Sequence, residues 1–301
     1  MLLAETTPYA FTWNLVADVR EMWSFPFMVN AFRAGAIVAV VAGAVGWFMV
    51  LRRQTFAGHT LSVVAFPGAA LATLIGVSTA VGYLGACLLA AVVIAGLRES
   101  GRSGVAVESA ATGTVQAFAL ACGFLFVTLY KGMLGGPQAL LFGTFLGITT
   151  GQVALLTVVG AVVLTLLAAF GRPLLFASSD REVAAARGVP VRALGAGFLL
   201  LLGAATAEAS QITGSLLVFA LLVVPAATAQ VLTARPVLGL ALTVLLGLAA
   251  CWLGLIAAFY QPYPLGFFVT TFAFAGYVLA QLTRAVRGAV GRVALPTGAT
   301  S

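Results

Sequence analysis

The chain has 301 residues, of which 62% are hydrophobic and only 8% charged, and its mean hydropathy is +1.12. Soluble domains have roughly 45 to 50% apolar and 25% charged residues, so the composition excludes a soluble domain and predicts an all-α polytopic protein of the cell inner membrane. The net charge of +7 suits contact with anionic lipid and makes no case for nucleic acid binding.

The first 30 residues are expected to form an interfacial segment. Here Asp18, Arg20 and Glu21 flank a group of aromatic residues, Trp13, Trp23, Phe25 and Phe27, which is typical of a helix lying in the membrane surface. Residues 1–14 lack the basic start and apolar core of a removable signal peptide. We therefore expect a membrane domain over residues 31–284 and a disordered cytoplasmic tail over residues 285–301.

Uncharged stretches of about 20 residues predict nine membrane-spanning helices, because that length crosses the hydrocarbon core. The predicted spans are residues 34–51, two arms of a hairpin within 60–97, 109–130, about 152–171, 193–207, 212–234, and two arms within 236–283. A shorter apolar piece, LLFGTFLG at 140–147, cannot cross the membrane. Because lipid does not tolerate its open backbone ends, we expect a re-entrant element that lies against protein.

The arginines predict the orientation of these spans, because short cytoplasmic loops carry the excess of basic residues. With the N-terminus outside, twelve of the fifteen basic residues fall in the cytoplasm: Arg52, Arg53, Arg98, Arg102, Arg172, Arg181, Arg187, Arg192, Arg235, Arg284, Arg287 and Arg292. Only Arg20, Arg33 and Lys131 fall outside. The opposite orientation would invert this ratio, so the C-terminus is expected in the cytoplasm.

A charged island, SDREVAAARG at Ser179–Gly188, separates two almost uncharged segments. It predicts a short cytoplasmic helix in which Ser179 is the N-cap, Asp180 and Glu182 lie in the first turn, Arg187 lies in the last turn and Gly188 ends the helix. Its alanines, Ala184 to Ala186, form a small face that could enter a groove of a partner protein. The alternative is an amphipathic helix that lies on the membrane.

Few polar groups interrupt the spans. Glu208 is the main ionisable candidate, because acids inside spans are costly and usually functional, although a place at the outer boundary is the alternative. Pro67 with Gly68, and Pro225, break helices and either line a pathway or form packing kinks. The single histidine, His59, is either a ligand or a polar boundary residue, and no spacing supplies further metal ligands. The three cysteines sit singly in separate spans and are interpreted as packing residues.

Four stretches share a recognisable pattern with a known family. They are FMVNAFRAGAIVAVVAGAVGWFMVLRR at Phe27–Arg53, GHTLSVVAFPG at Gly58–Gly68, the charged island, and QITGSLLVFALLVVPAATA at Gln211–Ala229. Together, over roughly residues 27–283, they resemble the integral-membrane permeases of ATP-binding-cassette importers for zinc, manganese and iron. The second stretch is similar to the family's Gly-Asp-Ala-Leu-Ser-His-Ala-x-x-Pro-Gly at Gly58, Leu61, Ser62, Ala65, Pro67 and Gly68.

The resemblance implies a type II importer-like permease with no permanently bound cofactor and a divalent metal as its transported substrate. Its implied partners are two copies of a cytoplasmic ATP-binding subunit, an extracytoplasmic substrate-binding protein, the bilayer, and a second permease that is either an identical copy or a paralogue. The residues implied to couple to the ATPase are Asp180, Glu182, Ala184, Arg187 and Gly188. The expected pathway residues, from the helix breaks and the resemblance together, are His59, Ser62, Pro67, Gly68, Glu208, Gln211 and Pro225.

The chain departs from the family pattern where a cation would be held. His59 stands where the family commonly has Asp, Val63 where it has His, and Ser109 where an acid commonly follows the one aligned with Glu108. The identity of the metal stays open for this reason, and transport of a metal chelate is an alternative.

Two other classes of function are alternatives. One is an ATPase-independent channel or secondary carrier, although a proton-driven carrier would need more intramembrane acids or histidines. The other is a structural membrane subunit. The chain carries no nucleotide site or catalytic set of its own, so it is interpreted as a transporter subunit and not as an enzyme.

Overall fold

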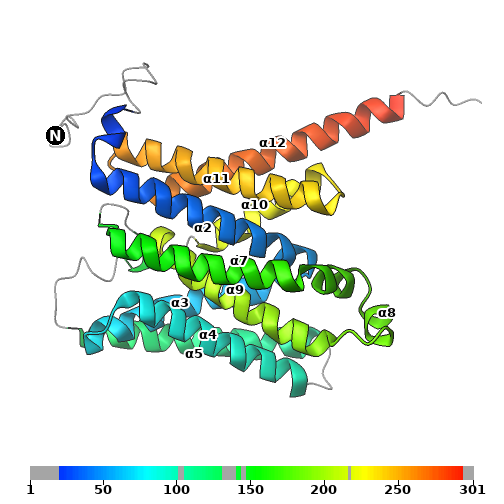
Figure 1. Cartoon of the computed structure of the whole chain (residues 1–301), viewed down its shortest axis with the longest axis horizontal. Coiled ribbons are helices and arrows are strands. Elements are labelled where there is room, and N and C mark those ends of the chain that lie inside the picture. Colours follow the sequence, from blue (N-terminus) through cyan, green and yellow to red (C-terminus); the bar gives the residue numbers. More distant parts are fainter. Residues whose placement is uncertain (1–19, 101–104, 131–139, 144–146, 216–217, 294–301) are drawn as a thin grey trace, which may run out of the picture.

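The computed structural model describes residues 20–100, 105–130, 140–143, 147–215 and 218–293, and over these residues the regular structure is entirely helical (Figure 1). The helices are α2 (Pro26–Leu51), α3 (Thr55–Ile75), α4 (Thr79–Ser100), α5 (Val105–Leu129), α7 (Thr150–Ser179), α8 (Arg181–Ala186), α9 (Val191–Thr213), α10 (Val218–Leu232), α11 (Pro236–Tyr260) and α12 (Leu265–Val293). Eight of them are long and apolar enough to cross a membrane, and α10 is a shorter apolar helix. For the described residues, this confirms an all-α membrane protein with about nine spans.

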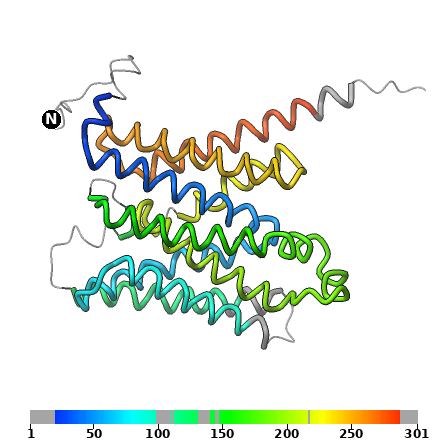
Figure 2. Tube along the Cα trace, in the orientation of Figure 1, coloured from blue at the N-terminus to red at the C-terminus, as the bar shows by residue number. Residues whose placement is uncertain are grey.

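The helices lie side by side in three groups (Figure 1), and Figure 2 traces the chain through them. In the first group α2, α10, α11 and α12 pack together, and in the second α3 packs against α4 and α5. Between them lie α7 and α9, and α9 contacts α2 on one side and α4 on the other. The two central helices therefore connect the outer groups.

The two ends of the bundle differ in the elements they gather. The C-terminal ends of α2 and α12 lie at the same end as α8, whereas the start of α2 and the turn between α11 and α12 lie at the opposite end (Figure 1). Arg52 follows α2, Arg187 follows α8 and Arg235 precedes α11, so these arginines belong to the α8 end. Arg20 and Arg33 precede or begin α2 at the opposite end. The arginines thus segregate along the bundle in the pattern that the predicted orientation requires.

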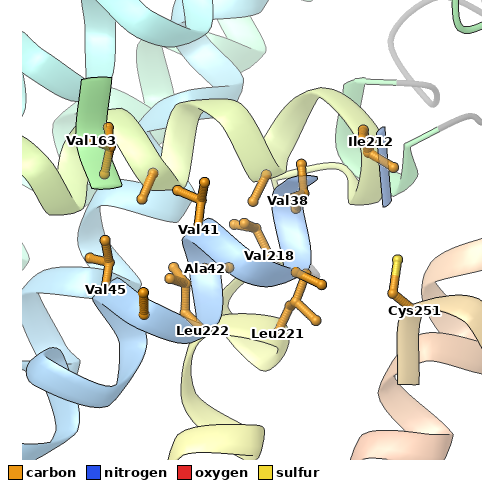
Figure 3. Close-up of a cluster of buried hydrophobic side chains, with 14 of the residues drawn as sticks. Val38, Val41, Ala42, Val45, Val163, Ile212, Val218, Leu221, Leu222 and Cys251 are labelled. Carbon is orange, nitrogen blue, oxygen red and sulfur yellow. The ribbon is translucent and has the colours of Figure 1, made fainter. Parts of the chain in front are cut away.

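The apolar core is centred on α2. Side chains from α2, α7, α9, α10 and α11 meet in it (Figure 3), and each of those labelled is at most 2% exposed: Val38, Val41, Ala42, Val45, Val163, Ile212, Val218, Leu221, Leu222 and Cys251. Cys251 and Cys87 are completely buried, which agrees with their interpretation as packing residues.

Glycines allow the closest helix crossings. A methyl group on Gly35 would lie 2.8 Å from the sulfur of Cys251, and one on Gly43 would lie 3.1 Å from Cα of Val244, so this face of α2 packs directly on α11. A methyl group on Gly46 would overlap the carbonyl oxygen of Leu222 on α10. Small residues at such crossings let two backbones approach, which is the usual basis of helix association in membranes.

Three helices continue well past the predicted C-terminal ends of their spans. α7 continues to Ser179, well past the predicted end near residue 171, because charge and Pro173 end an apolar run without ending a helix. α9 extends to Thr213, and the break before α10 lies at Gly214, whose φ of 75° and ψ of 157° are accessible essentially only to glycine. α12 continues to Val293, beyond the predicted end of the membrane domain at residue 284.

The short piece at 140–147 is partly described, over residues 140–143 and 147. The carbonyl oxygen of Leu140 accepts hydrogen bonds from the Tyr83 hydroxyl at 3.0 Å and from the Ser215 backbone N–H at 3.3 Å. A side chain on Gly143 would overlap the backbone at Ile212. The described part therefore lies against protein, as predicted for a re-entrant element. Residues 131–139 and 144–146, the predicted interfacial residues Trp13 and Asp18, and residues 294–301 of the predicted tail lie outside the described residues.

Candidate coupling helix and transport pathway

The charged island forms α8, a single short helix at one end of the bundle. Asp180 is its N-cap, because its carboxylate oxygen Oδ1 accepts hydrogen bonds from the backbone N–H groups of Glu182 and Val183, both at 3.0 Å. The prediction that Ser179 is the cap is wrong: Ser179 is the last residue of α7, and its hydroxyl donates to the carbonyl of Leu175. Asp180 caps the helix because it is the residue with extended backbone angles.

The predicted end of α8 at Gly188 is confirmed in detail. Gly188 has a φ of +79°, its N–H donates to the carbonyl of Ala185, and the N–H of Val189 donates to the carbonyl of Ala184, both at 3.0 Å. This pair of bonds around a left-handed glycine is the Schellman motif, which satisfies the last carbonyls of a helix. The motif turns the chain toward α9, which begins at Val191.

The faces of α8 differ from the expectation for its alanines. Ala184 is completely buried against its own chain, whereas Val183 is 44% exposed and Glu182, Ala185 and Arg187 are exposed. The expected small alanine face is therefore wrong in its composition, because Ala184 points inward and seats the helix on the bundle. The sequence analysis did not predict that Val183 and the charged residues around it form the exposed face of α8. In a helix of six residues, packing against the rest of the protein decides which side chains are exposed.

Arg52 joins the ends of three helices close to α8. Its guanidinium Nη1 donates to the Ser178 hydroxyl at 3.1 Å, and its Cζ lies 5.3 Å from the ring centroid of Phe198. Arg52 caps α2, Ser178 belongs to the last turn of α7, and Phe198 lies in α9. A cation over an aromatic ring is attractive, so this cluster holds together the two helices between which α8 is inserted.

On α3, His59 and Ser62 lie in the first two turns. The Ser62 hydroxyl donates to the carbonyl of His59 at 2.7 Å and is almost fully buried. The His59 ring lies edge-on to Phe219 of α10, with centroids 5.0 Å apart, and its Nε2 lies 3.4 Å from Nε2 of Gln116 on α5. Gln116 is a candidate that the sequence analysis missed; a lone amide in an otherwise apolar span was the available signal.

Pro67 and Gly68 lie further along α3, at its contacts with the neighbouring helices. A methyl group on Gly123 of α5 would lie 3.1 Å from Cβ of Pro67. Gly68 faces Gly82 of α4 so closely that a methyl group on either would overlap the backbone of the other. Both residues therefore lie at helix crossings, which agrees with the alternative that they serve helix packing.

Glu208 lies in α9, level with the middle of α2, and is only 1% exposed. A methyl group on Gly160 of α7 would lie 3.0 Å from its Oε1, and 3.0 and 3.2 Å from methyl groups of Val41 and Ile37 on α2. Neither carboxylate oxygen has a hydrogen-bond partner among the described residues. The alternative of a residue at the outer boundary therefore does not describe Glu208, which is buried among three helices.

Gln211 lies one turn further along α9 and lines a cavity of about 200 Å³. Its other polar lining residues are Thr79, Tyr83 and Gln152, from the starts of α4 and α7. Because α9 ends here, the cavity lies at the end of the bundle opposite α8 (Figure 1). No hydrogen bond or ring contact among the described residues joins this cavity or Glu208 to His59, so the predicted pathway residues do not form one compact site.

Pro225 lies inside α10 and is buried. A methyl group on Gly247 of α11 would lie 3.9 Å from Cγ of Pro225, so the proline ring faces α11. A proline inside a helix removes one backbone hydrogen bond. Among the described residues there is no group of three or more His, Cys, Asp or Glu side chains that could hold a metal ion.

A bundle of apolar spans, with the short capped helix α8 at one end, defines a multi-pass membrane protein. The model of the ABC 3 transport family matches residues 24–284, so the chain belongs to that family and is a permease, not an enzyme. It is 31% identical over 245 residues to the manganese transport system membrane protein MntC of Halalkalibacterium halodurans, covering 81% of this chain and 80% of that protein. It is 30% identical to the manganese import system permease protein ScaB of Streptococcus gordonii, covering 80% of this chain and 85% of ScaB.

A solved structure has the same fold. The structure of PsaBC from Streptococcus pneumoniae in complex with Fab superposes with a TM-score of 0.79 at 27% sequence identity, covering 88% of this chain and 95% of that chain. The predicted resemblance to an ATP-binding-cassette permease is thereby confirmed over most of the membrane domain.

Proposed function

We propose that this permease imports a divalent metal ion, with manganese as the first candidate. The observation that carries the proposal is the similarity over about four-fifths of the chain to MntC and ScaB, both named for manganese. This chain has His59 where the family commonly has Asp, and Val63 where the family has His. Carboxylates suit manganese, whereas an imidazole suits zinc and iron, so zinc and iron remain further candidates.

The proposed importer contains further subunits. Two copies of a cytoplasmic ATPase bind the exposed residues of α8, an extracytoplasmic protein delivers the metal at the opposite end, and a second permease completes the pathway. The segregation of arginines toward the α8 end supports a cytoplasmic place for that end. The short, rigidly capped α8 supports a docking role, since its Asp180 cap and Gly188 terminus fix its direction.

The proposed pathway uses the buried polar groups of α3, α9 and α10. The His59 ring lies against Phe219 in the first turn of α10, and Ser62 is buried beside His59 on α3. Glu208 supplies an acid inside the bundle, and Gln211 lines the cavity at the opposite end. Pro67, Gly68 and Pro225 set the helix crossings around these groups.

Reconstitution in lipid vesicles with a partner ATPase and a metal-binding protein tests the function. ATP-dependent uptake of radioactive manganese, reduced by unlabelled manganese and less by zinc or iron, is the expected result. Uptake of a metal only as a chelate would replace the free ion as the substrate, and uptake without the ATPase would identify a channel or secondary carrier and overturn the proposal.

A further inference from the structure

Three polar side chains of α3 and α5 form one hydrogen-bonded cluster, the His59–Thr60–Gln116 cluster. The Thr60 hydroxyl oxygen lies 3.1 Å from the carbonyl oxygen of Phe56 and 3.1 Å from one end of the Gln116 side-chain amide. The other end of this amide lies 3.4 Å from Nε2 of His59. Thr60 is completely buried, whereas His59 and Gln116 are half-buried.

The hydrogens in this cluster can be assigned by counting donors. With the amide oxygen toward Thr60, the Thr60 hydroxyl would donate to that oxygen and the NH2 group would donate to Nε2 of His59, so the ring proton would lie on Nδ1. Nδ1 is buried and has no partner among the described residues, so this orientation leaves a buried N–H donor without an acceptor. With the amide turned end for end, its NH2 group donates to the Thr60 oxygen, the Thr60 hydroxyl donates to the carbonyl of Phe56, and the ring N–H at Nε2 donates to the amide oxygen. Since the two ends of an amide have the same shape and are distinguished by their partners, the NH2 group belongs toward Thr60.

This assignment determines the state of the imidazole. With its NH2 toward Thr60, Gln116 presents its oxygen to Nε2 of His59, and that oxygen accepts a hydrogen bond only if Nε2 carries the ring proton. The neutral imidazole then has its lone pair on Nδ1. Nδ1 is buried and has no hydrogen-bond partner among the described residues.

We propose that Gln116 is a positioning residue that fixes the Nε2-protonated tautomer of His59 and thereby reserves Nδ1 as a ligand for the transported divalent cation. This inference rests on the proposed function. Imidazoles that bind metals through one nitrogen commonly donate the other N–H to an oxygen acceptor, which orients the ring and raises its basicity. Gln116 supplies that acceptor, and Thr60 holds the amide in place.

The single histidine permits a direct test of the tautomer. Permease labelled with nitrogen-15 histidine gives one pair of ring nitrogen signals, because the chain has one histidine. At a pH where the ring is neutral, we expect the proton on Nε2 in the wild type and a mixture of tautomers in Gln116→Leu. Gln116→Glu should keep the Nε2 proton, because a carboxylate also accepts from it. A proton on Nδ1 in the wild type would overturn the inference.

Metal binding provides the second readout. Addition of zinc, a diamagnetic probe, should shift the Nδ1 signal of the wild type. Gln116→Leu should weaken this binding by about tenfold or more, the effect typical of losing an orienting partner, whereas Gln116→Glu restores it. Thr114→Val is the matched control on α5, because the Thr114 hydroxyl donates only to its own helix at Ala110. Equal zinc binding by Gln116→Leu and the wild type would contradict the positioning role.

The two proposals fail separately. If the wild type shows the Nε2 proton and the zinc-induced shift but vesicles take up no metal with ATP, the proposed function is wrong and the assignment of the cluster stands. If uptake is normal and Nδ1 neither carries the lone pair nor responds to zinc, the inference is wrong and the import function stands.

Discussion

Glu208 is the residue whose surroundings conflict most with its chemistry. Its two carboxylate oxygens are buried against Gly160, Val41 and Ile37, and neither has a hydrogen-bond partner among the described residues. A buried polar group without a partner costs stability that an apolar side chain of similar size would not. Ionisable side chains inside membrane spans are costly and usually functional, which supports the proposal that Glu208 takes part in transport.

Replacing Glu208 separates stability from transport. We expect Glu208→Leu to raise the free energy of unfolding by about 1 to 3 kcal/mol, because the unsatisfied group is removed, and to lower ATP-dependent metal uptake. Glu208→Gln keeps the size and polarity of the side chain and serves as the matched variant. The measurements are thermal unfolding in detergent and vesicle uptake; a Leu variant that is more stable and transports normally would exclude Glu208 from the pathway.

Gly46 tests the packing between α2 and α10. We expect Gly46→Ala to destabilise the protein by about 1 to 3 kcal/mol, because the added methyl group would overlap the carbonyl oxygen of Leu222 and the helices would have to separate. Gly85→Ala in α4 is the control, since its methyl group would meet no atom within 4 Å. Thermal unfolding should show a lower midpoint for the first variant and an unchanged or higher midpoint for the second.

At the scale of elements, α8 is too short to be stable alone, since isolated helices of fewer than about 12 residues are marginal in water. Its structure depends on the Asp180 cap, the Gly188 turn and the burial of Ala184. Any partner that binds α8 therefore contacts an element whose direction is fixed by α7 and α9.

We expect Gly188→Pro to disrupt the turn that joins α8 to α9. Proline cannot adopt a φ of +79° and has no N–H to donate to Ala185, so the turn into α9 would be lost. We expect a folded variant with little ATP-dependent uptake and uncoupled ATP turnover, measured in vesicles after gel filtration in detergent. Gly188→Asn is the control, because asparagine tolerates left-handed angles. Normal uptake by Gly188→Pro would argue against coupling through α8.

The sequence predicted elements better than the orientation of side chains. Hydropathy located the spans, because the length of an apolar run is a local property, and the left-handed Gly188 was predicted from the residue type that such angles require. The sequence did not predict that Asp180 is the N-cap or that the side chain of Ala184 is buried, because both depend on where α7 ends. Gln116 became a candidate only when folding brought α5 beside His59, and such a contact between distant residues leaves no local pattern.

At the scale of the whole molecule, the orientation in the membrane is a testable consequence of the arginine pattern. We expect a cysteine at Tyr263, which is 59% exposed in the turn between α11 and α12, to react with an impermeant thiol reagent in intact cells. A cysteine at the exposed Ala185 of α8 should react only after the membrane is opened. Both are introduced into a chain in which Cys87, Cys122 and Cys251 are replaced by alanine; the reverse order of labelling would invert the topology.

The Arg52 cluster limits how the bundle can move. One guanidinium holds the last turn of α7 through Ser178 and the ring of Phe198 on α9, so spreading these two helices apart at the α8 end breaks at least one of the two contacts. A displacement of α8 is therefore passed on to α7 and α9 as a pair, and through Arg52 also to α2. Since the apolar core is centred on α2, a force applied to the short helix α8 acts on the centre of the molecule and not on a peripheral helix alone.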